Sequence, residues 1–129
     1  MSKLRVFRNV LKFRGFRQSL KYAMEGIAYL FLFHRNMRII FILGIIALIA
    51  GLYYRLRGIE LIALCISVTL VFMAEIFNTA IELIIDMFTD KYNTRIKLVK
   101  DISAAVALIA VFNAIAIGIV IFGKRLFGT

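Results

Sequence analysis

Three long apolar runs constrain the possible folds of this chain more than any other feature of its sequence. They cover residues 37–54, 61–88 and 102–122, and each is close to or above the roughly 20 residues that an α-helix needs to cross about 30 Å of hydrocarbon. Hydrophobic residues make up 63% of the 129 residues, whereas soluble domains average about 45–50%. The sequence therefore predicts an all-α integral membrane protein with three spanning helices, as a single domain over residues 1–129.

The segment over residues 1–36 is basic and amphipathic, which is typical of a helix lying in the membrane interface. Its cations recur at spacings of three and four residues, at Arg5, Arg8 and Lys12 and again at Arg14, Arg17 and Lys21. An apolar stripe is formed by Phe16, Leu20, Ala23, Met24 and Ile27. The basic stretch is too long for a secretory signal peptide and no A-x-A cleavage pattern follows, so we expect the mature chain to be complete.

The net charge of +10 comes from basic residues that flank the apolar runs, which favours a membrane surface over nucleic acid as the partner. Most of these cations lie in the N-terminal segment and in the loop between the second and third runs. By the positive-inside rule we expect both regions to be cytoplasmic.

Polar residues interrupt the second apolar run at Glu75, Asn78, Glu82 and Asp86. At about 100° per residue they share an arc of roughly 80° on one helix face, and charge in such a segment is costly and usually functional. If the helix enters the membrane near Leu61, Glu82 and Asp86 reach the cytoplasmic interface. Glu75 then lies about 10 Å deeper, near the depth of a lipid headgroup.

This arrangement fits phosphoryl transfer at a membrane surface, which needs a carboxylate for Mg²⁺, a cation for phosphate and a base for the acceptor's proton. We assign Glu82 to the metal, Lys100 to phosphate and Glu75 to the base. Spacing alone leaves two alternatives open. One is a hydrogen-bond network of protonated carboxyls between helices, and the other is a proton or cation pathway.

Small residues recur along one face of the third run, where membrane helices can approach closely. They are Ser103, Ala107, Ala110, Ala114 and Gly118. Since three helices bury little polar surface, we expect a homo-oligomer whose polar faces meet between protomers.

Residues 75–86, with Glu75, Asn78, Glu82 and Asp86, and residues 100–105, beginning Lys100-Asp101, closely resemble the signature of the prokaryotic diacylglycerol kinase and undecaprenol kinase family. The similarity runs over about residues 19–122. It implies a homotrimeric kinase of a bacterial cytoplasmic membrane, with an N-terminal surface helix, three spanning helices and active sites built between subunits. It also implies ATP and Mg²⁺ as cofactors and a membrane lipid as substrate.

The resemblance implies a role for each matching residue. Glu75 matches the family's general base, Glu82 its metal and ATP ligand, and Asn78 a polar partner in the site. The positions that match its nucleotide-binding side are Tyr22, Lys91, Tyr92, Asn93, Lys100 and Asp101.

This chain departs from the family pattern at two positions. His34 stands where many members have a glutamate that acts as a second metal ligand, and Ile40 stands where they often have His or Glu. A neutral imidazole is a poor ligand for Mg²⁺, so His34 is a weak metal candidate and an inactive homologue is an open alternative.

The acceptor lipid is the least constrained part of the prediction. Residues 89–92 and the pair Arg35-Asn36 resemble the undecaprenol branch slightly more than the diacylglycerol branch. We therefore predict an ATP-dependent kinase of undecaprenol, with a diacylglycerol kinase that makes phosphatidic acid as the alternative. A non-enzymatic or ion-conducting small membrane protein is a further alternative.

Overall fold

The computed structural model describes residues 13–88, 91 and 93–128, which form four α-helices joined by short connections and include no strand. The helices are α2 (Phe13–Phe33), α3 (Arg35–Tyr53), α4 (Ile59–Phe88) and α5 (Thr94–Phe127). The last three are long and apolar enough to cross a membrane. The predicted fold class, an all-α membrane protein with an N-terminal helix and three spanning helices, is therefore confirmed. The chain divides into two units, Met1–Arg35 and Asn36–Thr129, and each is described by itself.

Helix α2 carries exposed apolar side chains along one stripe. Phe16, Leu20, Met24 and Ile27 follow one another at spacings of three or four residues and are all exposed. An exposed stripe of this kind supports the predicted interfacial helix from Phe13 onward. Residues 1–12 of the predicted segment lie outside the described residues.

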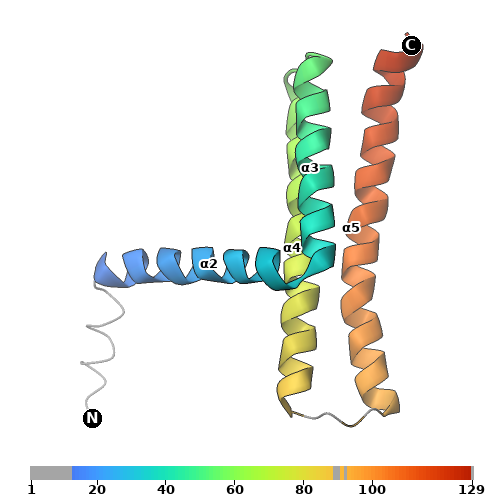
Figure 1. The fold of residues 1–129 in the computed structure, drawn as a ribbon. Helices are drawn as coiled ribbons and strands as arrows, with labels where there is room; N and C mark the ends of the chain where they lie inside the picture. Colours follow the sequence, from blue (N-terminus) through green and yellow to red (C-terminus); the bar gives the residue numbers. More distant parts are fainter. Residues whose placement is uncertain (1–12, 89–90, 92, 129) are drawn as a thin grey trace. The chain divides into compact units, whose positions relative to one another are not determined.

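In the second unit α3, α4 and α5 run alternately up and down, as Figure 1 shows. Helix α3 ends in a Schellman motif, in which Arg55 adopts a left-handed φ of 57°. The Arg55 N–H donates to the Leu52 carbonyl at 3.1 Å and the Leu56 N–H donates to the Gly51 carbonyl at 3.0 Å. This geometry satisfies carbonyls at the helix end and turns Leu56 inward, where it is buried.

Two glycines of α3 leave room for side chains of α4. Gly44 and Gly51 are seven residues apart, so they share one helix face. A Cβ atom at Gly44 would lie 3.0 Å from Val68 Cγ1, and one at Gly51 would lie 2.7 Å from Leu64 Cδ2. Small residues at such contacts are typical of membrane helices, which gain from close van der Waals packing.

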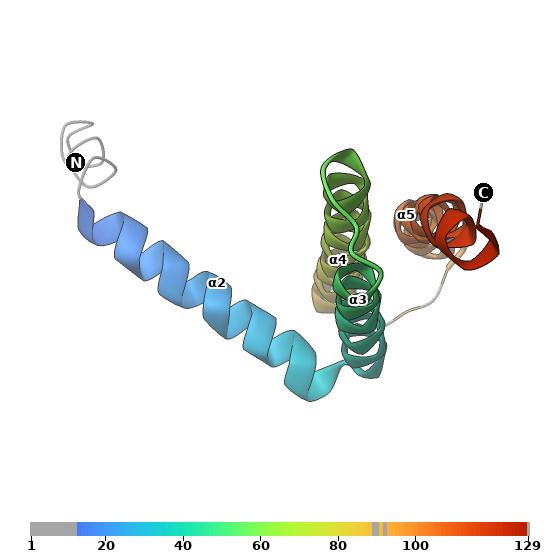
Figure 2. The same ribbon diagram turned by 90° about the horizontal axis from the view of Figure 1, so that it is seen from above.

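Short side chains also line the contact between α4 and α5, which Figure 2 shows beside each other from above. The buried residues here are Ser67, Ala74 and Thr79 on α4 and Ser103 and Ala107 on α5. The rest of the predicted small-residue stripe, Ala110, Ala114 and Gly118, is half-buried. Most large apolar side chains of the three helices are exposed, as expected of a surface that faces lipid or another subunit.

Candidate functional site

The bundle formed by α3, α4 and α5 has two ends that differ in chemistry. At the first, which we call the Asp86 end, α4 finishes and α5 begins. At the second, the Glu60 end, α3 finishes, α4 begins and α5 finishes. Figure 1 shows that α4 and α5 continue past the first turn of α3 toward the Asp86 end. The polar residues that the sequence predicts to act together lie on the parts of α4 and α5 that extend beyond α3.

One face of α4 carries the four polar residues of the second apolar run. All four lie inside the helix, so the spacing of three, four and four residues places them on one face as predicted. Glu75, Asn78 and Glu82 are half-buried, whereas Asp86 is exposed. At 1.5 Å per residue Glu75 lies about 10 Å further from the helix end than Glu82. The face therefore presents carboxylates at two depths.

Helix α5 contacts this face through two polar side chains. The Ser103 hydroxyl donates to Asn78 Oδ1 at 2.6 Å. Lys100 Nζ lies 3.3 Å from Asp86 Oδ1, in a pair whose side chains are 36% and 63% exposed. A pair so open to solvent adds little stability, but it places a cation one helical turn from Glu82. The two contacts fix Asn78 and Lys100 at the carboxylate face.

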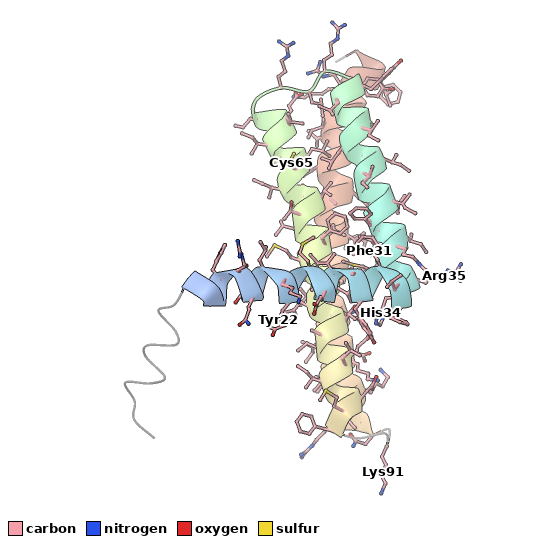
Figure 3. The ribbon with its side chains drawn as sticks, turned by 60° about the vertical axis from the view of Figure 1, so that its left-hand side comes forward. Tyr22, Phe31, His34, Arg35, Cys65 and Lys91 are labelled. Carbon is pink, nitrogen blue, oxygen red and sulfur yellow. The ribbon has the colours of Figure 1, made fainter. Side chains whose placement is uncertain are left out.

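Other residues that are predicted to contact the nucleotide lie in or next to the first turns of α5. Asn93 is the N-cap of α5, and its side chain accepts a hydrogen bond from the Ile96 N–H at 3.0 Å. Asp101 Oδ2 lies 2.6 Å from Lys97 Nζ in an exposed ion pair. Figure 3 shows Lys91 in the connection between α4 and α5. These residues all lie at the Asp86 end, whereas Tyr92 lies outside the described residues.

Two predicted site residues, Tyr22 and His34, belong to the first unit. Tyr22 is exposed on α2, and the His34 ring lies just beyond that helix, with its centroid 5.7 Å from that of Tyr29. Because the two units are described separately, the roles of Tyr22 at the nucleotide and His34 at the metal stay predictions.

The donor set at the Asp86 end can supply part of a metal site. Among the described residues no three His, Cys, Asp or Glu side chains are grouped closely enough to hold a metal ion. Glu82 still offers a carboxylate oxygen, the ligand type that Mg²⁺ prefers, and Mg²⁺ is commonly held by one or two carboxylates together with substrate phosphates and water. The residues therefore fit Mg²⁺ carried by a nucleotide better than a resident metal.

An apolar cavity of about 250 Å³ opens on the same face of α4 as the carboxylates. Val68 lines it and precedes Glu75 by seven residues, so the cavity lies about 10 Å deeper into the bundle. Its walls come from all three helices, through Ile40, Leu43, Gly44, Ala47, Val68, Val71, Val111, Ala114 and Ile115. Such a cavity can hold a hydrocarbon chain whose polar end reaches Glu75.

Sequence reasoning missed the cavity and the two contacts between α4 and α5. The contacts have a signal in the sequence, because Lys100, Ser103 and Ala107 are spaced by three and four residues and so share one face of α5. The cavity has none, since its residues are ordinary apolar positions on three helices.

Comparison with known proteins identifies the family of this chain. Residues 21–122 match the family model described as prokaryotic diacylglycerol kinase. A diacylglycerol kinase of Synechocystis is 32% identical over 101 residues, which are 78% of this chain and 58% of that protein. An undecaprenol kinase of Bacillus subtilis is 39% identical over 80 residues, which are 61% of this chain and 64% of that protein. The matched segments thus span less than two thirds of the length of either relative.

Proposed function

Because this chain belongs to the prokaryotic diacylglycerol kinase family, we propose that it transfers the γ-phosphoryl group of ATP to the hydroxyl of a membrane lipid. The observation that carries the proposal is the face of α4 on which Glu75 and Glu82 lie between an apolar cavity and the Lys100 side chain. A lipid chain and a nucleotide can approach that face from opposite directions.

Glu75 is the proposed general base. The lipid hydroxyl oxygen forms a bond to the γ-phosphorus, the bond from that phosphorus to the ADP oxygen breaks, and the hydroxyl proton passes to the Glu75 carboxylate. The half-buried position of Glu75, between the cavity and the helix end, suits a base that must reach a hydroxyl anchored in lipid. The products are a lipid phosphate and ADP.

Glu82 and Lys100 are the proposed nucleotide-side residues. Glu82 would hold Mg²⁺, which when bound offsets the charge of the phosphates and helps to orient them. Lys100, one turn away, would contact the phosphates, a role in which lysine acts as a point charge. Asp86 holds the Lys100 ammonium at this face before nucleotide binds. Asn78 would orient polar groups between the two carboxylates. The other residues proposed to contact the nucleotide are Lys91, Tyr92, Asn93 and Asp101, together with Tyr22, which is assigned by family resemblance.

Undecaprenol is the favoured acceptor, and diacylglycerol is the alternative. The cavity beside Glu75 is apolar and suits either hydrocarbon chain. The preference rests on residues 89–92 and on Arg35-Asn36, which resemble the undecaprenol branch slightly more. The relatives include one protein named for each substrate.

We further propose that the protein works as a homotrimer in the cytoplasmic membrane, with its Asp86 end toward the cytoplasm. Asn113 supports this assembly, because it is exposed in the middle of an apolar helix and a polar side chain there is best satisfied by another helix. The cations of the α4–α5 connection and of the first turns of α5 support the orientation.

Phosphate transfer from labelled ATP to undecaprenol and to diacylglycerol, supplied in parallel with Mg²⁺, tests the proposal. We expect phosphorylated undecaprenol. Phosphorylation of diacylglycerol alone would mean that the reaction is correct but that diacylglycerol is the acceptor. Glu75→Gln should lower kcat by at least about 100-fold, as expected for loss of a general base. If folded protein phosphorylates neither lipid, the kinase proposal is rejected. Full activity of Glu75→Gln would reject Glu75 as the general base.

A further inference from the structure

A second groove lies at the Glu60 end, between the first turns of α4 and the last turns of α5. It encloses about 380 Å³, a volume in the usual range of small-molecule sites. Its floor is apolar and includes the small residues Ala63 and Ala116, and Glu60 and Lys124 stand among its lining residues. From Glu60 to Glu75 the helix rises by about 22 Å, so the charged mouth of this groove is well separated from the proposed catalytic carboxylates.

The charges around the groove are unequal. Arg125 Nη2 lies 3.0 Å from Glu60 Oε2, which compensates that carboxylate. Lys124 has no ion-pair partner in the described part of the chain. Arg55 and Arg57 in the loop between α3 and α4 add two more cations, so the described residues at this end carry three positive charges in excess. Of these cations Lys124 lines the groove itself, so the mouth of the groove is complementary to an anion at Lys124.

The groove adjoins a buried apolar cluster, to which its lining residue Ile121 belongs. Leu56, Leu64 and Ile121 form a buried apolar cluster, and the rings of Tyr54 and Phe122 pack with centroids 5.9 Å apart. A preformed groove loses little conformational entropy when a ligand binds. It also combines an apolar floor with a cation at a helix end, where an interfacial headgroup would lie.

We propose that this groove binds one acidic phospholipid, with its phosphate at Lys124 and one acyl chain along Ala63 and Ala116. Juxtamembrane cations attract such headgroups, and the Lys124 stem can lie along apolar surface while its ammonium reaches the phosphate. A second copy of this chain would not supply the negative charge that Lys124 lacks at this end, because each copy carries the same excess of cations there.

Lipid retention by the purified full-length protein, counted by native mass spectrometry from detergent micelles, tests the site. The probes are dioleoylphosphatidylglycerol and dioleoylphosphatidylcholine, which differ in headgroup charge. We expect the native chain to retain the acidic lipid preferentially. Lys124→Gln should weaken that retention about fivefold, the effect of removing one cation near a lipid headgroup. Arg57→Gln, which removes the same charge from the same end but outside the groove, should change it less than twofold.

A further variant separates the groove from the charged surface around it. Ala116→Phe should block the floor and reduce retention of the acidic lipid while the protein stays folded by circular dichroism. Equal retention of both lipids by the native chain, or equal losses in Lys124→Gln and Arg57→Gln, would overturn the proposal. A change of oligomeric state in Ala116→Phe with lipid retention intact would assign the groove to a second copy instead.

Discussion

The two ends of the bundle are built from the same helices, α4 and α5, yet they are held together differently. At the Glu60 end a Schellman turn brings Leu56 onto a buried cluster with Leu64 and Ile121. At the Asp86 end the contacts are polar, through Ser103 with Asn78 and Lys100 with Asp86. Large apolar side chains pack together at the Glu60 end, whereas polar side chains join the two helices at the Asp86 end.

The difference indicates how a chain this short separates stability from chemistry. Close packing stabilises membrane helices. Small buried side chains occur along the α4–α5 contact, but the buried cluster of large apolar side chains lies at the Glu60 end, where no reaction is proposed. Exposed ion pairs stabilise little, so the charges at the Asp86 end are better explained by a ligand than by folding. Substitutions at the two ends should therefore have separable effects.

The largest expected effect is on catalysis at the Asp86 end. Glu82→Gln keeps the shape of the side chain but removes the charge proposed to hold Mg²⁺. Because a bound metal supplies several kcal/mol of transition-state stabilisation, we expect kcat/KM for ATP to fall by at least about 100-fold. The Mg²⁺ concentration for half-maximal rate should rise. Steady-state kinetics across a Mg²⁺ titration measure both quantities.

Glu25→Gln is the matched control for that variant. Glu25 is an exposed carboxylate on α2 with no role in the proposed site, so the same substitution there should leave kcat/KM within about twofold. Unchanged Mg²⁺ dependence in Glu82→Gln would mean that Glu82 does not hold the metal. The proposed difference in chemistry between the two ends would then lose its support.

The next largest effect is on stability at the Glu60 end. A Cβ atom at Gly51 would already lie 2.7 Å from Leu64 Cδ2 and 3.3 Å from Leu56 Cδ1, and both of those side chains are buried. Gly51→Leu should therefore separate α3 from α4 and cost about 2 kcal/mol, as overpacked cores do. Unfolding in mixed micelles measures the loss.

Activity of Gly51→Leu tests the separation of the two ends. The rate per folded molecule should stay at the native value, because the substitution lies at the end remote from Glu75 and Glu82. A large fall in that rate without unfolding would show that packing at the Glu60 end controls the site, and the two ends would then form one functional unit.

The apolar runs predict the three long helices because hydropathy and length together leave few alternatives in a membrane. Helix ends were harder to predict. The apolar pattern predicts the third span over residues 102–122, whereas α5 begins at Thr94 and extends to Phe127. Asn93 caps the helix, and polar residues continue it outside the apolar run, so hydropathy marks the span and not the whole helix.

The shared face of the four polar residues on α4 follows from helical periodicity alone. Their partners do not, because the bond from Ser103 to Asn78 and the pair of Lys100 with Asp86 depend on the register between α4 and α5. Ala74 and Ala107 are buried, but no local pattern specifies which residues of α4 lie opposite which residues of α5. The apolar cavity needs three helices to form and was beyond sequence reasoning for the same reason.

The smallest expected effect concerns two buried serines that differ in what they join. The Ser103 hydroxyl donates across to Asn78 on α4, whereas the Ser67 hydroxyl donates at 2.8 Å to the Ala63 carbonyl of its own helix. Ser103→Ala should lower the free energy of unfolding by about 0.6 kcal/mol, the average for hydrogen bonds between membrane helices. It should also lower kcat by about threefold, because Asn78 loses its anchor. Ser67→Ala should change neither, since that carbonyl keeps its backbone hydrogen bond. Equal effects of the two variants on unfolding and turnover would mean that the polar contact at the Asp86 end is no more important than an ordinary buried hydroxyl.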